Sequence, residues 1–275
     1  MFTCHKISRI SFNFRGSCNS TCPFCYIPFV DANNGDIVIW KKVVDAILTF
    51  QPDVITIGGG EPFCNEGFTE LLKYISQKGC AIHVDSNASH LSYEAYSAID
   101  KYIDIIALPL DGIGVVHDKF RNWQGHYELV LQKIGELSKL NVKVRINTIV
   151  HKHNYHQLIE IAKLIRFQNI AQWQLYEYWF FPEVNVPPTR FDNKEINKLL
   201  PLLSKESQKT VEYSPVSQRE KTYFFVSSIG KMYGIVNGNK YIEYGDIWDE
   251  SALDNAIKNT NFTENELRAQ KKILL

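Results

Sequence analysis

"RISFNFRGSCNSTCPFCYIP", residues 9–28, is the stretch from which the fold and the chemistry of this chain follow. Its first six residues form a short β-rich run that predicts a strand. Cys18, Cys22 and Cys25 come directly afterwards. Thiolates are soft ligands, and three of them in one short loop can converge on a single metal centre. The stretch therefore predicts a strand followed by a metal-binding loop that is one ligand short of a closed tetrahedral site.

The composition is that of an ordinary globular protein. The chain has 275 residues, enough for one large α/β domain and an extension. Its 30 basic and 30 acidic residues cancel, which argues against general nucleic-acid binding and against a polybasic membrane anchor. No signal peptide and no run of about 20 apolar residues is visible, so we expect a cytoplasmic protein. Three of the six cysteines are clustered, which favours metal or redox chemistry over a secreted disulfide framework.

Short β-rich runs alternate with longer amphipathic stretches over the first two thirds of the chain. We expect strands at residues 9–14, 53–58, 81–86, 103–110, 142–150 and 172–179. We expect helices at about 37–50, 66–79, 91–100, 126–140 and 154–168. Helical crossovers between strands imply a parallel α/β sheet. The pattern alone fits both a partial (β/α)6 barrel and a doubly wound open sheet.

The rest of the chain changes character. A Pro-rich loop at 182–191 precedes a helix expected near 193–206. The runs "KTYFFV", "KMYGIV" and "KYIEYG" then predict short strands, with a turn signal at 237–239. The last stretch, "ENELRAQKKILL", resembles a charged helical tail. We therefore expect a core domain at residues 1–209 and a small C-terminal extension at 210–275.

Two kinds of metal site suit the cysteine loop. A structural zinc site needs a fourth ligand, which Cys4, His5 or a remote residue could supply. An iron–sulfur cluster normally has four cysteine ligands, so three cysteines leave one iron open to a molecule that is not protein. The spacing favours the cluster without excluding zinc.

The aromatic residue before the last cysteine further favours an iron–sulfur cluster. With Phe24 next to Cys25, the loop resembles the Cys-x3-Cys-x-aromatic-Cys signature of the radical S-adenosylmethionine (SAM) superfamily, in its usual place after the first strand. The resemblance implies a TIM-like partial (β/α)6 barrel and one [4Fe–4S] cluster held by Cys18, Cys22 and Cys25. It also implies that the amino and carboxylate groups of SAM chelate the fourth iron.

Two further segments at strand ends resemble motifs of that superfamily. "GGGEP", at 58–62, resembles the motif that holds the methionyl amine of SAM, although alone it is also an ordinary glycine-rich turn. The residues to which this role carries over are Gly59, Gly60, Glu61 and Pro62. "DSNAS", at 85–89, resembles the segment near the ribose, so Ser86 and Asn87 are expected to bind its hydroxyl groups.

The stretch at 110–134 resembles the Asp-Gly…His-Asp-x-x-Arg segment of SPASM-type radical SAM enzymes, which modify peptides and proteins. In them an arginine pairs with the SAM carboxylate, and Arg121 occupies that place; the alternative is a surface salt bridge. Pro109 stands where relatives commonly carry a serine that also contacts the carboxylate. That part of the contact is therefore missing or supplied differently.

The fifth and sixth strands resemble those of SPASM-type and viperin-like enzymes. Asn147 is expected to face the cofactor, and Tyr176 and Glu177 are weaker candidates near the adenine. "GDIWDES", at 245–251, resembles a turn that opens a SPASM domain, yet no cysteine follows Cys80. We therefore expect no auxiliary cluster, and an extension that closes the barrel mouth or holds a substrate.

Other residues have both a functional and an ordinary interpretation. Cys64 follows the "GGEPF" segment and is a candidate hydrogen donor, although buried cysteines are more often core residues. His151, His153 and His156 could bind a metal, but solvated polar positions are the better interpretation.

The resemblance implies an enzyme that cleaves SAM reductively and abstracts hydrogen from a substrate through a 5′-deoxyadenosyl radical. The expected electron donor is a flavodoxin or a ferredoxin. A ribosomally synthesised peptide is the first expectation for the substrate, and a nucleotide or other small molecule, as in viperin-like enzymes, is the alternative. The remaining alternative is a zinc-stabilised binding protein without enzymatic activity.

Overall fold

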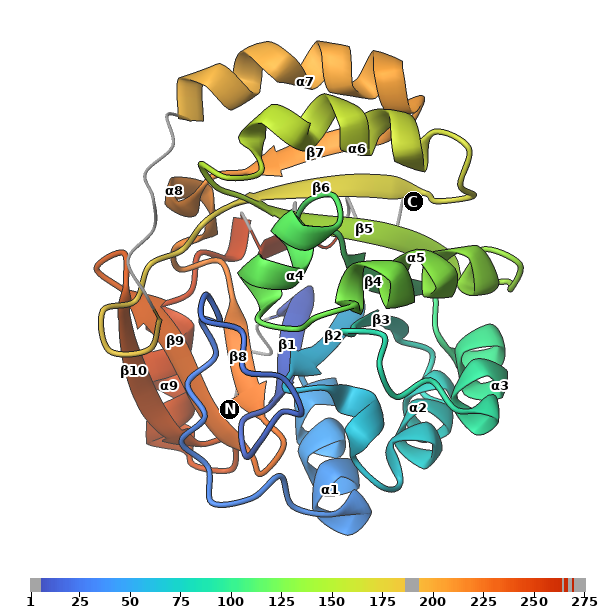
Figure 1. The fold of residues 1–275 in the computed structure, drawn as a ribbon. Helices are drawn as coiled ribbons and strands as arrows, with labels where there is room; N and C mark the ends of the chain where they lie inside the picture. Colours follow the sequence, from blue (N-terminus) through green and yellow to red (C-terminus); the bar gives the residue numbers. More distant parts are fainter. Residues whose placement is uncertain (1–5, 186–192, 264, 267–268, 270–275) are drawn as a thin grey trace.

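One curved sheet of ten strands organises the part of the chain that the structure describes. The computed structural model describes residues 6–185, 193–263, 265–266 and 269, so Cys4, His5, much of the Pro-rich loop and most of the predicted tail lie outside the described residues. The order of the strands is β10-β9-β8-β1-β2-β3-β4-β5-β6-β7. Figure 1 shows the parallel strands curving around an interior, with helices on the outer face.

The parallel strands carry the chain from one helix to the next. They are β1 (Arg9–Phe14), β2 (Val54–Gly59), β3 (Ala81–Asp85), β4 (Ile105–Pro109), β5 (Lys143–Val150), β6 (Gln172–Glu177) and β7 (Thr210–Ser214). Each pairs in parallel with the next, as a partial TIM-like barrel requires. The six predicted strands are confirmed, whereas β7 was not predicted. Its sequence, TVEYS, has no apolar run to mark it.

The crossover helices pack their apolar sides against the sheet. They are α1 (Ile37–Leu48), α2 (Phe68–Ser76), α3 (Tyr93–Tyr102), α5 (His126–Leu137), α6 (Leu158–Ile165) and α7 (Asn193–Ser207). The first begins where the Asp36 side chain accepts from the amides of Val38 and Ile39, and it buries Trp40 and Val44. Three short helical segments, η1 (Pro62–Cys64), α4 (Val115–Arg121) and η2 (Tyr155–Gln157), complete this part.

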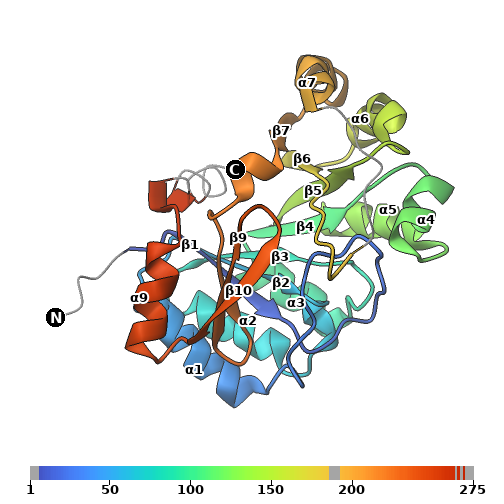
Figure 2. The same cartoon turned by 90° about the vertical axis from the view of Figure 1, so that its left-hand side faces the viewer.

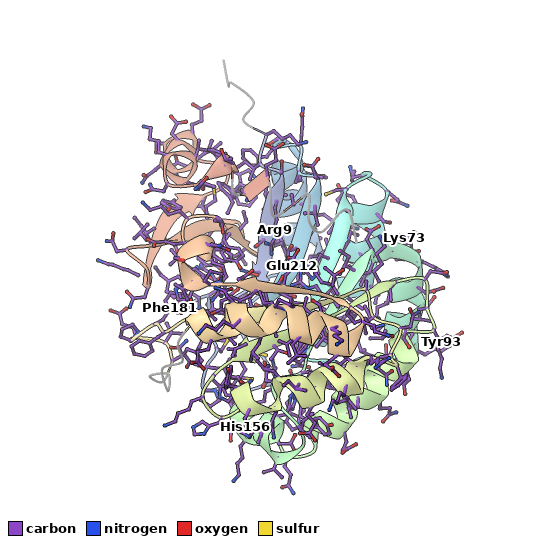
Figure 3. All side chains as sticks on the ribbon, turned by 90° about the horizontal axis from the view of Figure 1, so that it is seen from above. Arg9, Lys73, Tyr93, His156, Phe181 and Glu212 are labelled. Carbon is purple, nitrogen blue, oxygen red and sulfur yellow. The ribbon has the colours of Figure 1, made fainter. Side chains whose placement is uncertain are left out.

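Side chains alternate between the two faces of each strand, and this alternation makes the barrel interior polar. On β1, Ile10 and Phe12 point outward into the hydrophobic core, whereas Arg9, Ser11 and Asn13 are buried on the other face. In Figure 3, Arg9 lies among the strands at the centre of the molecule. A polar interior enclosed by an apolar shell is suited to binding a polar ligand.

The segment after residue 210 continues the same sheet. β8 (Phe224–Ser227) pairs in parallel with β1, and β9 (Lys231–Val236) and β10 (Lys240–Asp246) follow as an antiparallel hairpin. Two further helices in this part are α8 (Val216–Arg219) and α9 (Glu250–Lys258). Figure 2 shows the hairpin with α9 beside it. The three predicted short strands are therefore confirmed, and the division at residue 209 stays a prediction.

Within the described residues, no helix has the length and apolar character needed to span a bilayer.

Candidate functional site

A cavity of about 250 Å³ opens at the carboxyl ends of the parallel strands. Loops at this edge carry the functional residues of barrel enzymes, because all parallel strands end there. The cavity is lined by most of the predicted site residues: Cys18, Cys22, Phe24, Cys25, Gly59, Gly60, Glu61, Ser86, Asn87, Arg121 and Asn147. Tyr176 and Glu177 line it too, whereas Pro62 and Cys64 do not.

The cysteine loop leaves β1 and returns the three thiols to this cavity. The amide of Cys25 donates to the carbonyl of Cys22 at 3.1 Å, which closes a turn between them. Burial raises the pKa of the Cys25 thiol to about 12, so metal binding there releases a proton. Among the described residues, no three His, Cys, Asp or Glu side chains are grouped as ligands of a single metal ion. Three soft thiols around one cavity fit an iron–sulfur cluster.

Gly60 brings the end of β2 directly beneath the cysteine loop. Its amide donates to the carbonyl of Phe14 at 2.7 Å. A Cβ on Gly60 would lie 2.1 Å from the backbone oxygen of Ser17, and Gly59 adopts a φ of +94°. Glycine is therefore needed at both positions, and the close neighbour that excludes a side chain at Gly60 is the cysteine loop itself.

Glu61 joins the end of β2 to the end of β3. Its buried carboxylate accepts from the Ser86 hydroxyl at 2.8 Å, the Asn87 amide at 2.6 Å and the Phe63 amide at 3.3 Å. Burial is the largest influence on its pKa and raises it to about 7, although these donors oppose the shift. Pro62 is the first residue of the η1 turn that follows, so in this structure it serves to start that turn.

The predicted ribose ligands have protein partners. Besides donating to Glu61, the Ser86 hydroxyl accepts from the amide of Ala88 at 2.9 Å. The side-chain Nδ2 of Asn87 donates to Oδ1 of Asn19 in the cysteine loop at 2.9 Å. Both residues line the cavity, and their contact with a ribose stays a prediction.

Arg121, at the end of α4, is held by its Nε. That atom donates to the fully buried Asp111 carboxylate at 2.7 Å, and Asp111 also accepts from the Ile149 amide. The guanidinium lies 5.2 Å from the ring centroid of Phe24. No described residue accepts from its two Nη groups, which suits them to bind a carboxylate such as that of SAM.

Two buried histidines connect Asp111, the partner of Arg121, to the residues that follow β3. The Asp111 amide donates to His117 Nδ1 at 3.0 Å, His117 Nε2 lies 2.8 Å from His126 Nδ1, and His126 Nε2 lies 2.9 Å from the Asn87 carbonyl oxygen. The first donor and the last acceptor fix both tautomers, with the proton on Nε2 of each ring. Burial lowers the pKa of both histidines, to about 2 for His117, so both are neutral. Both histidines lie in the stretch at 110–134, whose motif includes His117 but does not include His126.

Asn147 lines the cavity and bridges two charged residues. Its Oδ1 accepts from Arg145 Nε at 2.9 Å, and its Nδ2 donates to Asp85 at 3.1 Å. Arg145 also donates to the Tyr176 hydroxyl at 2.7 Å. Sequence reasoning missed Arg145, although it lies two residues before Asn147 and therefore on the same face of β5.

The C-terminal hairpin braces the cysteine loop from below. Arg15, only 2% exposed, pairs with Asp31 through two bonds of 2.8 and 3.1 Å and with Glu243 at 3.2 Å. Its guanidinium carbon lies 4.3 Å from the ring centroid of Tyr233, and Asn13 donates to the Tyr233 hydroxyl at 2.7 Å. The start of the loop is thus tied to the hairpin of β9 and β10, and Arg15 also ties it to Asp31 at the other end of the loop.

The remaining described cysteines and the histidines at 151–156 lie in different environments. Cys64 is exposed and does not line the cavity, so its position does not support a role as hydrogen donor. Cys80 is buried and donates to the Pro52 carbonyl, as a core residue does. His151 is buried against Phe120 with ring centroids 4.0 Å apart, so the expectation of a solvated position was wrong there, although His153 and His156 are exposed.

The sequence profile of the Radical SAM superfamily matches residues 12–165, more than half of the chain. This chain belongs to the radical SAM superfamily. Its cofactors are accordingly a [4Fe–4S] cluster and SAM, and the residues present fit them. Three thiols and a glycine turn line one cavity, together with an arginine whose Nη groups have no acceptor among the described residues.

Individual relatives are more distant. The chain is 28% identical over 163 residues to the antilisterial bacteriocin subtilosin biosynthesis protein AlbA of Bacillus subtilis, covering 57% of this chain and 36% of AlbA. It is 23% identical over 253 residues to an S-adenosylmethionine-dependent nucleotide dehydratase of Flammeovirga pacifica, covering 85% of this chain and 84% of that protein. The chain spans less than half of the length of the first curated relatives it matches.

Among solved structures, SuiB of Streptococcus suis bound to S-adenosylmethionine matches with a TM-score of 0.75 at 14% identity. The match covers 90% of this chain and 65% of SuiB. This likeness shows the partial barrel fold.

Proposed function

We propose that the chain is an enzyme that cleaves SAM reductively and abstracts hydrogen from a substrate. When bound, the cluster and SAM would supply the radical chemistry, namely a one-electron reductive cleavage of SAM and the abstraction of hydrogen from an unactivated carbon. The observation that carries the proposal is the convergence of the three thiols, Arg121 and the glycine turn on one cavity.

The protein supplies binding, orientation and exclusion of water. Arg121, fixed by Asp111, binds the SAM carboxylate, and Phe24 packs beneath the guanidinium. Glu61 holds the ends of β2 and β3 together, so that Gly59, Gly60 and the Ser86–Asn87 segment face SAM at a set separation. A flavodoxin or ferredoxin delivers the electron.

Anaerobic reconstitution with iron and sulfide tests this proposal. The reconstituted protein, reduced with dithionite in the presence of SAM, is expected to release 5′-deoxyadenosine. A colourless protein that holds one zinc ion and leaves SAM intact would contradict the proposal and favour a zinc-stabilised binding protein.

For the substrate, we propose a ribosomally synthesised peptide. The similarity to AlbA, which is named for bacteriocin biosynthesis, supports this class, as does the fold shared with SuiB, whose structure is also known with a precursor peptide. A nucleotide is the second candidate, because the nucleotide dehydratase matches over 84% of its own length, unlike AlbA. Turnover of a nucleoside triphosphate without any peptide would contradict the proposal of a peptide substrate.

A further inference from the structure

Arginines in the barrel interior line the same cavity but play no part in the proposed SAM site. Arg9, Arg145 and Arg219 are 6%, 2% and 5% exposed and line the cavity together with the three cysteines. An arginine side chain stays charged in a protein. Burying guanidinium groups is costly unless anions compensate their charge.

Arg145 has only neutral acceptors among the described residues. They are the Asn147 side-chain oxygen and the Tyr176 hydroxyl. The carboxylate of Asp85 reaches this network through Asn147, which separates it from the guanidinium. The charge of Arg145 is therefore not directly paired within the described part of the chain.

Arg219, at the end of α8, also donates only to a neutral acceptor among the described residues. One of its Nη groups donates to the backbone carbonyl of Glu177, whose own carboxylate accepts from the Val216 amide. Its guanidinium carbon lies 4.7 Å from the Trp179 ring centroid and 5.4 Å from that of Tyr176. Its Nε is buried without a hydrogen-bond partner among the described residues. A buried donor on a charged group without an acceptor costs free energy, and a ligand that brings an acceptor to this arginine would recover part of that cost.

The two guanidinium groups meet at one side chain. Arg145 contacts the hydroxyl of Tyr176, and Arg219 lies over its ring. We propose that Arg145 and Arg219 form an anion subsite that binds a carboxylate or phosphate group of the substrate. The guanidinium fork matches both groups, and burial of both arginines away from bulk water strengthens the contact. This inference rests on the proposed function, because it assigns the subsite to the substrate of that reaction.

The place of the subsite relative to SAM follows from the same contacts. Asp85 ends β3 immediately before Ser86 and Asn87, and Asn147 links it to Arg145. The subsite therefore lies next to the segment expected at the ribose. An anion fixed there would hold the substrate by one end while its reacting carbon faces the deoxyadenosyl group.

Isothermal titration of the reconstituted, SAM-bound protein with inorganic phosphate and with succinate tests the proposal. We expect one anion per chain, with binding weakened at least tenfold by Arg145→Gln and by Arg219→Gln. Arg166→Gln is the matched control, because Arg166 is exposed on the outer face, and it should leave binding unchanged. Thermal unfolding identifies any variant that fails to fold, and two independent arginines keep the test decisive.

The two probes also distinguish the source of the anion. Tighter binding of phosphate indicates a phosphorylated small molecule, and tighter binding of succinate indicates an acidic peptide group. If neither probe binds, or if wild type and both variants bind them equally, the subsite is overturned. Failure of the proposed function appears separately, as absent 5′-deoxyadenosine on reduction, a readout that needs no substrate.

Discussion

Replacement of Gly60 by alanine tests whether the glycine turn positions the cysteine loop. The added Cβ would lie 2.1 Å from the backbone oxygen of Ser17 and 3.4 Å from that of Phe14. The Ser17 carbonyl must move by about 1.3 Å to restore an ordinary 3.4 Å contact. A backbone atom cannot swing away as a flexible side chain does, so Cys18, the next residue, moves with it. Overpacking of this kind costs about 1–3 kcal/mol.

The assay is iron content and visible absorbance after anaerobic reconstitution, together with the rate of 5′-deoxyadenosine release. We expect Gly60→Ala to bind substoichiometric iron and to cleave SAM at least tenfold more slowly than wild type. Gly135→Ala is the control, because Gly135 lies within α5 and an added Cβ meets no atom within 4 Å. That variant should be unchanged or about 0.5–1 kcal/mol more stable.

Full cluster occupancy and a wild-type rate of SAM cleavage in Gly60→Ala would refute this reasoning. They would mean that the cysteine loop accommodates the displacement without consequence for the ligand geometry.

Other predictions concern the metal ligands, the buried acid and the histidine pair. Cys25→Ser should abolish cluster binding, measured as iron content, whereas Cys64→Ser should retain it, because Cys64 lies outside the cavity. Glu61, whose pKa rises to about 7 from 4.5, holds a proton in the folded chain that the unfolded chain releases. Stability should therefore fall as pH rises from about 4.5 to about 7, by about 3 kcal/mol at most, and urea unfolding should show Glu61→Gln without this slope. His126→Phe should raise the KM for SAM about tenfold, because it severs the link between Asp111 and Asn87, while His126→Gln, which keeps a donor and an acceptor, should recover most of the loss; equal KM values would reject the link. Arg121→Lys should weaken SAM binding at least tenfold in equilibrium titration, since lysine lacks the planar fork, and an unchanged affinity would show that the Nη groups do not bind the carboxylate.

The strands and crossover helices could be predicted because their residues are buried on characteristic periods. "VITIG" and "IIALP" are nearly continuous apolar runs, as expected for strands covered on both faces. By contrast, β7 is half-exposed and short, and only its pairing with β6 defines it as a strand. The helix α4 lies inside the motif at 110–134, whose residues indicate chemistry but have no clear helical period.

The candidate site was predictable where one local segment carries the signal, as in the cysteine loop and the glycine turn. Arg145 and Arg219 were missed because their role depends on meeting at Tyr176, three elements brought together only by folding. The partnership of His117 with His126 was missed for the same reason. Pro62 matches the sequence motif but does not line the cavity, which the motif alone could not indicate.

The brace beneath the cysteine loop has a consequence for biosynthesis. Glu243 lies 228 positions after Arg15, and Tyr233 lies 220 positions after Asn13. While a ribosome is still making the barrel strands, the thiols have already emerged, yet Arg15 has no Glu243 to pair with. Until the hairpin is translated, the nascent loop is exposed to oxidation and to the wrong metal, so iron–sulfur delivery is best timed to the completed polypeptide.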